Sequence, residues 1–156
     1  FSAVHSIDSA RTARALESAL SASPGTAGLE ASPASNSARK PHTDALDILL
    51  EVNTSGEESK FGYRDLGSLL GDTEEIATMP HLRIVGLMTL APFTSDETVL
   101  RRSFSQLRET LQRLQDTFPE LPATELSMGM SNDFEIAVEE GSTLLRLGTV
   151  LFGDRG

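Results

Sequence analysis

The sequence lacks cysteine and long apolar runs, and it is short of positive charge. With no cysteine among 156 residues, disulfide scaffolds, cysteine zinc sites and thiol catalysis are excluded. No apolar run reaches the roughly 20 residues that a membrane-spanning helix needs, and no signal peptide is visible. The formal net charge of −10 argues against binding to nucleic acid or to an anionic membrane through bulk charge. A phosphate ligand would therefore need a local cup of hydrogen-bond donors.

Metal-binding patterns are missing as well. The sequence has no His-x-His, no HExxH and no carboxylate-rich loop that would supply ligands to a metal ion. His5 lies in a predicted strand without a second ligand at metal-binding spacing, so we expect a structural role for it. The hydrophobic content of 38% and the charged content of 23% are typical of a globular domain with its own core.

Strand-like and helix-like segments alternate along the chain. The predicted strands span residues 1–8, 45–53, 82–90, 125–130 and 144–150, and the predicted helices span 9–20, 66–79, 97–117 and 134–140. This alternation indicates parallel βαβ units, and right-handed crossovers leave an open doubly wound sheet or a barrel as the two common outcomes. An eight-stranded barrel typically needs about 250 residues. The sequence therefore predicts either a small open sheet or the last five strands of a barrel.

One long segment does not fit the alternating pattern. Residues 21–44 are rich in Ser, Ala, Pro and Gly. Such a composition buries too little apolar area to offset the entropy of ordering the chain. We predict a disordered insertion at 21–44 within a single domain that covers residues 1–156.

Two successive predicted strands near the end of the chain are followed by small, donor-rich residues. Ser131-Asn132-Asp133 follows the first strand, and Glu135 stands three residues after Asn132, which is the spacing of a helix capping box. Gly148-Thr149 is set into the second strand. Helix N-termini and the loops after the last two strands of a barrel often hold a phosphate. The alternatives are a helix cap for Ser131 and an ordinary strand-end turn for Gly148-Thr149.

Five stretches together resemble a known family. They are VHSID (4–8), EVNTSGEESKFG (51–62), GLMTLAP (86–92), ELSMGMSNDFEIAVEEGST (125–143) and LRLGTVLFGDR (145–155). The chain resembles the pyridoxal-phosphate homeostasis proteins, whose barrel is similar to the N-terminal domain of alanine racemase. The resemblance implies an α/β fold of the (β/α)8 TIM-barrel type, of which this chain supplies strands four to eight as the C-terminal part of a domain that binds pyridoxal phosphate (PLP).

The resemblance also implies which residues hold the cofactor. Ser131, together with Gly148 and Thr149, would bind its phosphate, largely through backbone N–H groups. Arg146 would face the pyridine nitrogen and keep it unprotonated, because a guanidinium cannot give up a proton; an unprotonated ring is a weak electron sink. Met130 is the methionine expected to approach the ligand. The alternative for Arg146 is a buried ion pair with a carboxylate.

The lysine that forms the Schiff base in the family lies on a first strand that this chain does not contain, so we interpret the chain as N-terminally truncated. Its two lysines are Lys40, in the 21–44 segment, and Lys60. Lys60 matches a loop lysine of the family that does not carry the cofactor. It is either a surface lysine or a loop lysine close to the cofactor mouth.

The resemblance implies a PLP-binding protein of intracellular PLP homeostasis, a carrier or buffer without catalysis. Its partners would be the small-molecule cofactor and PLP-dependent apoenzymes, with no nucleic acid and no membrane. The expected location is cytoplasmic, with a mitochondrial one as the alternative. A second hypothesis is a PLP-dependent amino-acid racemase; these enzymes use a tyrosine from a separate β domain, and the one tyrosine here is Tyr63. A third is a truncated chain that neither folds independently nor binds the cofactor.

Overall fold

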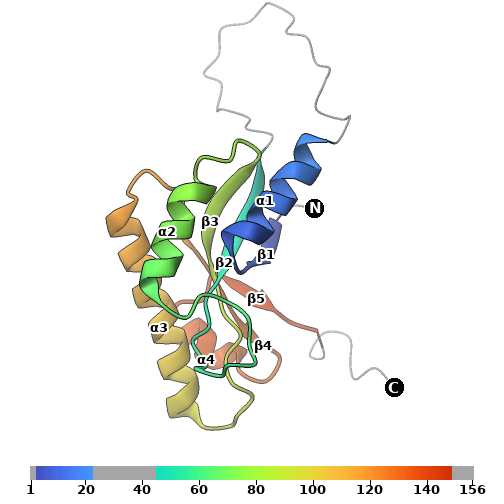
Figure 1. Ribbon diagram of the computed structural model, residues 1–156. Helices are drawn as coiled ribbons and strands as arrows, with labels where there is room; N and C mark the ends of the chain where they lie inside the picture. Colours follow the sequence, from blue (N-terminus) through green and yellow to red (C-terminus); the bar gives the residue numbers. More distant parts are fainter. Residues whose placement is uncertain (1–2, 23–44, 149–156) are drawn as a thin grey trace, which may run out of the picture.

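The computed structural model describes residues 3–22 and 45–148 (Figure 1). Strands and helices alternate from end to end, in the order β1 (Ala3–Ile7), α1 (Ala10–Ser21), β2 (Leu46–Glu51), α2 (Leu66–Ile76), β3 (Leu82–Met88), α3 (Glu97–Thr117), β4 (Glu125–Met130), α4 (Phe134–Glu139) and β5 (Leu144–Arg146). Of the insertion predicted at 21–44, residues 23–44 lie outside the described residues, while Ser21 ends α1. No helix among the described residues is long and apolar enough to cross a membrane.

The five strands form one parallel sheet in the order β1-β2-β3-β4-β5. A doubly wound sheet reverses its strand order part-way, whereas here each strand is added beside the previous one. Consecutive helices pack against each other, α1 on α2, α2 on α3 and α3 on α4, and Figure 1 shows α1, α2 and α3 side by side over the sheet. The barrel-type prediction is therefore confirmed for five strands, and the open doubly wound alternative is wrong.

The main core lies between the sheet and its helices. Side chains alternate between the two faces of a strand, so Ile48 and Leu50 of β2 pack into this helix-side core with Leu107 of α3. Leu49 points to the other, concave face and is also fully buried. The continuous apolar run of β2 predicted burial on both faces, and the structure confirms it.

The start of α3 was predicted correctly from neighbouring residues, whereas the start of α4 was not. The bounds of α3 are those predicted, because Asp96 caps its first turn by accepting hydrogen bonds from the backbone N–H groups of Thr98 and Val99. The capping box predicted for Asn132 and Glu135 is wrong. The N-cap of α4 is Asp133, and its carboxylate accepts a hydrogen bond from the backbone N–H of Met130 at 2.7 Å. The remaining elements match their predicted ranges within a few residues at each end.

Gly129 fixes the connection between β4 and α4. Its φ is +98°, and a Cβ at this position would lie 2.6 Å from the Cβ of Ala137, a contact that forbids a side chain. Because glycine tolerates this backbone conformation, α4 can fold back directly onto β4. Residues 131–133 are therefore held in a short turn at the carboxyl end of the strand.

Candidate functional site

Arg146 of β5 lies at the centre of the polar residues on the concave face. Its Nη1 donates to the Ser127 Oγ at 2.6 Å, and its Nη2 donates to the Thr89 backbone oxygen at 2.6 Å. Burial lowers the pKa of the guanidinium, while the charges of Asp133 and Glu51 act in the opposite direction. No carboxylate of the described residues lies within ion-pair distance of Arg146. The alternative of a buried ion pair is therefore wrong for this part of the chain.

His5 and Ser127 meet across the concave face. The His5 Nδ1 lies 3.0 Å from the Ser127 Oγ, although β1 and β4 are separated by two strands in the sheet. Such a contact requires the sheet to curl, as in a barrel. Burial and the nearby charge of Arg146 both lower the pKa of His5, so the ring is neutral at pH 7. The structure gives His5 a hydrogen-bond partner, while its structural role stays a prediction.

Ser131 and Gly148 lie beside each other. The Gly148 backbone N–H donates to the Ser131 Oγ at 3.4 Å, which is long for such a bond. Ser131 is not the N-cap of α4, so the helix-cap alternative for Ser131 is wrong. A Cβ placed on Gly148 would have no atom of the described residues within 4 Å. The structure thus brings together the loops after β4 and β5, while Thr149 lies outside the described residues.

The three methionines near the site separate into two groups. Met88 and Met128 are buried, whereas the side chain of Met130 is 45% exposed at the end of β4. Met130 directly precedes Ser131, and its N–H is held by Asp133. Of the three, Met130 is therefore the one in a position to meet a ligand beside Ser131.

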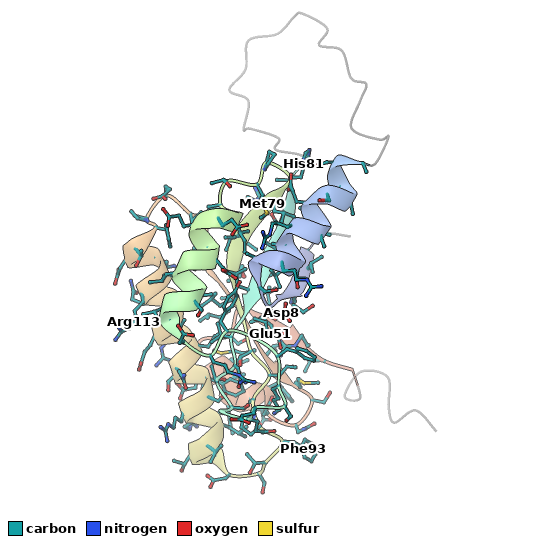
Figure 2. The ribbon with its side chains drawn as sticks, in the orientation of Figure 1. Asp8, Glu51, Met79, His81, Phe93 and Arg113 are labelled. Carbon is teal, nitrogen blue, oxygen red and sulfur yellow. The ribbon has the colours of Figure 1, made fainter. Side chains whose placement is uncertain are left out.

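Two carboxylates at the ends of β1 and β2 were missed by sequence reasoning. Figure 2 shows Asp8 and Glu51 close to each other near the middle of the molecule. Glu51 is buried on the concave face, and burial followed by the charge of Asp8 raises its pKa, with Arg146 opposing. The sequence signal for Glu51 was the strand alternation in LDILLE, which places Asp47 and Glu51 on the same face as Leu49.

Lys60 is held in the loop between β2 and α2. Its Nζ donates to the Ala91 backbone oxygen at 3.3 Å and pairs with Glu57 at 3.2 Å. The side chain is 28% exposed, so it is neither a fully solvated lysine nor one in contact with Ser131, Arg146 or Gly148.

Together these residues form a site with two kinds of donor. The Ser131 hydroxyl and the Gly148 N–H, which donates to it in this structure, are neutral groups of the kind that bind an oxyanion, and Arg146 is a fixed cation. Among the described residues, two of the five N–H donors of the guanidinium contact Ser127 and Thr89.

Residues 3–156 match the family described as alanine racemase, N-terminal domain. This chain belongs to that family. The family predicted from the sequence motifs is therefore confirmed, and so is the barrel-type fold that the motifs implied.

Curated relatives carry the name pyridoxal phosphate homeostasis protein. The one from Aquifex aeolicus is 43% identical over 111 residues, which cover 70% of this chain and 47% of the relative. The human one is 40% identical over 119 residues, which cover 75% of this chain and 43% of the relative. The chain thus spans about half the length of the curated relatives that it matches.

Solved structures agree with this assignment. PipY of Synechococcus elongatus without PLP has a TM-score of 0.77 at 30% identity, covering 98% of this chain and 62% of that one. The same protein with PLP bound has a TM-score of 0.74 at 29% identity, covering 98% and 61%. A histidine racemase from Leuconostoc mesenteroides, with a TM-score of 0.59 at 18% identity over 97% of this chain and 34% of that one, shares the fold alone.

Proposed function

We propose that this chain binds PLP at the carboxyl ends of β4 and β5 and takes part in intracellular PLP homeostasis as a carrier or buffer without catalysis. Ser131, Gly148 and Thr149 bind the phosphate, Arg146 faces the pyridine nitrogen, and Met130 lies beside the ring. The observation that carries the proposal is the Ser131–Gly148 contact, which follows directly on the paired residues Met130 and Arg146, together with the lack of a described carboxylate in ion-pair distance of Arg146. The PLP-bound structure of PipY supports the choice of ligand.

The residues of the site favour storage of the cofactor over chemistry on it. When bound, PLP supplies an aldehyde that condenses with amines and a ring that can withdraw electrons. Arg146 cannot release a proton, so a ring nitrogen that accepts a hydrogen bond from it stays unprotonated. Electron withdrawal is then weak, as expected of a carrier. The names of the curated relatives, which state homeostasis, agree with this.

The described residues support retention of PLP without a covalent bond. Lys60 is the one lysine among them, and its ammonium contacts Ala91 and Glu57. We therefore propose that the phosphate contacts and Arg146 retain the cofactor, and that Lys60 remains unmodified.

A borohydride experiment tests the proposal. The purified chain is incubated with PLP, passed through a desalting column, and then reduced and mapped by mass spectrometry. We expect stoichiometric PLP in the protein fraction and no stoichiometric adduct on Lys60. A stoichiometric adduct on Lys60 would overturn the non-covalent mode. Absence of PLP from a folded, monomeric chain would overturn the binding proposal and favour the hypothesis of a non-binding fragment.

A pair of serine variants makes the site assignment specific. Ser131→Ala removes the proposed phosphate contact, whereas Ser105→Ala removes a hydroxyl of α3 that bonds only to the Arg102 backbone oxygen. We expect Ser131→Ala to weaken PLP binding about tenfold and Ser105→Ala to leave it unchanged. Pyridoxal without its phosphate should bind weakly to all three proteins.

The racemase hypothesis finds no support in Tyr63. Its side chain is 6% exposed in the helix-side core, and its hydroxyl donates to the Asp72 Oδ2 at 2.8 Å. Burial and this bond raise its pKa, so Tyr63 cannot act as a base on the concave face. Racemisation of an amino acid by the PLP-loaded protein would contradict the carrier proposal.

The proposal includes delivery of PLP to apoenzymes in the cytoplasm, or in mitochondria as the alternative. Its support is the homeostasis name shared by bacterial and human relatives. The test is the reactivation of a PLP-dependent apoenzyme by the loaded chain. We expect faster reactivation than an equal concentration of free PLP gives in the presence of a PLP scavenger.

A further inference from the structure

The Ser127 hydroxyl has two side-chain partners, His5 and Arg146, and it offers them one proton and two acceptor lone pairs. Arg146 can only donate, so the Ser127 Oγ accepts from it at 2.6 Å. The one hydroxyl proton of Ser127 is then left for the His5 Nδ1 at 3.0 Å. Ser127 is 0% exposed, so bulk water offers no alternative acceptor. A His5 Nδ1–H could donate to the second lone pair of the Ser127 Oγ, but the buried hydroxyl proton would then have no acceptor among the described residues. An unprotonated Nδ1, with the ring proton on Nε2, satisfies both groups.

The other end of the guanidinium is fixed by Thr89. The Thr89 backbone oxygen accepts from Arg146, and the Thr89 backbone N–H donates to the Ser127 backbone oxygen at 3.1 Å. The Thr89 Oγ1 also donates to the Val52 backbone oxygen at 2.7 Å. Because Thr89 and Ser127 are bonded to each other, the two acceptors of Arg146 cannot move independently.

We propose that His5 is a positioning residue for the cofactor site. By accepting a hydrogen bond from the Ser127 hydroxyl, His5 orients the Ser127 oxygen toward Arg146. Arg146 is thereby held with its remaining guanidinium donors directed at the ring nitrogen of PLP. This inference rests on the proposed function. It assigns a role to Ser127, which contacts Arg146 directly, and to His5, which contacts Arg146 through the Ser127 hydroxyl. Neither residue is proposed to contact the ligand.

Two substitutions of His5 separate positioning from packing. His5→Asn keeps an acceptor, because the Asn Oδ1 stands near the place of the histidine Nδ1. His5→Leu keeps the bulk and removes the acceptor, which leaves the Ser127 proton buried without a partner. We expect His5→Leu to weaken PLP binding about tenfold and to shift the absorbance maximum of the bound cofactor. His5→Asn should restore both to near the parent values.

Matched controls cover general effects of the changes. His81 directly precedes β3, at the amino end of that strand, and its Nδ1 lies 2.6 Å from the Glu17 Oε1. His81→Asn should leave PLP affinity and spectrum unchanged. Thermal unfolding of every variant shows whether it is folded at the temperature of the binding measurement. Equal loss of affinity in His5→Leu and His5→Asn, with both folded, would overturn the proposal.

A ligand-free measurement separates this inference from the proposed function. ¹⁵N NMR of the histidine rings in the chain without PLP should show His5 as the Nε2–H tautomer, with Nδ1 accepting a hydrogen bond that Ser127→Ala abolishes. A protonated Nδ1 would overturn the inference even if PLP binds. If the parent chain fails to bind PLP while the tautomer is as expected, the proposed function fails and the Ser127–His5 bond direction stands.

Discussion

Gly86 of β3 and Glu125 of β4 approach so closely that a Cβ on Gly86 would overlap the backbone carbonyl of Glu125. The two residues are also register partners at the start of the β3–β4 pairing. Because the overlap is with backbone rather than with a flexible side chain, the strands could accept a side chain here only by separating. The same pairing joins Thr89 to Ser127, the two acceptors of Arg146.

Gly86→Ala should destabilise the fold by about 3 kcal/mol, the upper part of the range for overpacked sites. Urea unfolding followed by circular dichroism measures this. Gly71→Ala is the matched control, since Gly71 lies in α2 and a Cβ there meets no atom within 4 Å. Alanine in a helix interior should stabilise by about 0.5–1 kcal/mol. Equal effects of the two changes would contradict the close approach.

Tyr63→Phe should cost about 1.5–3 kcal/mol of unfolding free energy, as expected for a hydrogen bond to a carboxylate. The Asp72 Oδ2 that accepts from Tyr63 also accepts from the Ala10 backbone N–H at 2.7 Å, so the bond links α1, α2 and the loop before α2. Because burial raises the pKa of the single tyrosine, alkaline titration at 295 nm should show no tyrosinate until the chain unfolds. Ionisation near pH 10 in the folded state would count against this burial.

Glu51→Gln should stabilise the folded chain at pH 7. Burial raises the Glu51 pKa above its ordinary 4.5, so the folded state holds the proton more tightly than the unfolded state. Stability is therefore lost as pH rises from about the ordinary value through the raised one, and glutamine removes this loss. We expect a higher Tm for Glu51→Gln than for the parent at pH 7, and no difference at pH 4. A loss at pH 7 would show that attraction to Arg146 outweighs burial.

Arg146→Lys should weaken PLP binding about tenfold or more, because one ammonium cannot span Ser127 and Thr89 as the planar fork does. Isothermal titration with PLP measures the change. Arg83→Lys is the control, since Arg83 pairs with Asp47 at 2.6 Å on the concave face away from Ser127. If both variants bind PLP like the parent, Arg146 does not face the cofactor.

The order of elements could be predicted because its signals are local. Hydrophobic spacing and the Asp96 cap predict the bounds of α3, and the apolar run of β2 predicts burial of that strand on both faces. The cap of α4 was assigned wrongly because three neighbouring residues, Ser131, Asn132 and Asp133, can each cap a helix. Only the tertiary turn shows that the Asp133 carboxylate bonds to Met130 instead.

The candidate site was predictable only in part. Ser131, Gly148 and Arg146 stand out through motifs close together in the chain. Ser127 lies inside a strand whose other residues look apolar, and His5 is 122 residues away from it. Their contact depends on the curl of the sheet across two intervening strands, and no pattern within either segment encodes that curvature. The alternation of LDILLE places Glu51 on the concave face, but its neighbouring charges, Asp8 after β1 and Arg146 in β5, come from distant segments that no local pattern brings together.

The backbone of Gly129 has a consequence for the speed and energetics of recognition. Its left-handed conformation and its contact with Ala137 hold the turn that carries Ser131 in one geometry before any ligand arrives. The entropy of ordering that turn is lost when the chain folds, not when a ligand docks, which is what preorganisation means for affinity. A ligand bound by Ser131 would then meet a preformed surface. Its retention would be determined by its dissociation rate rather than by a closing motion of the protein.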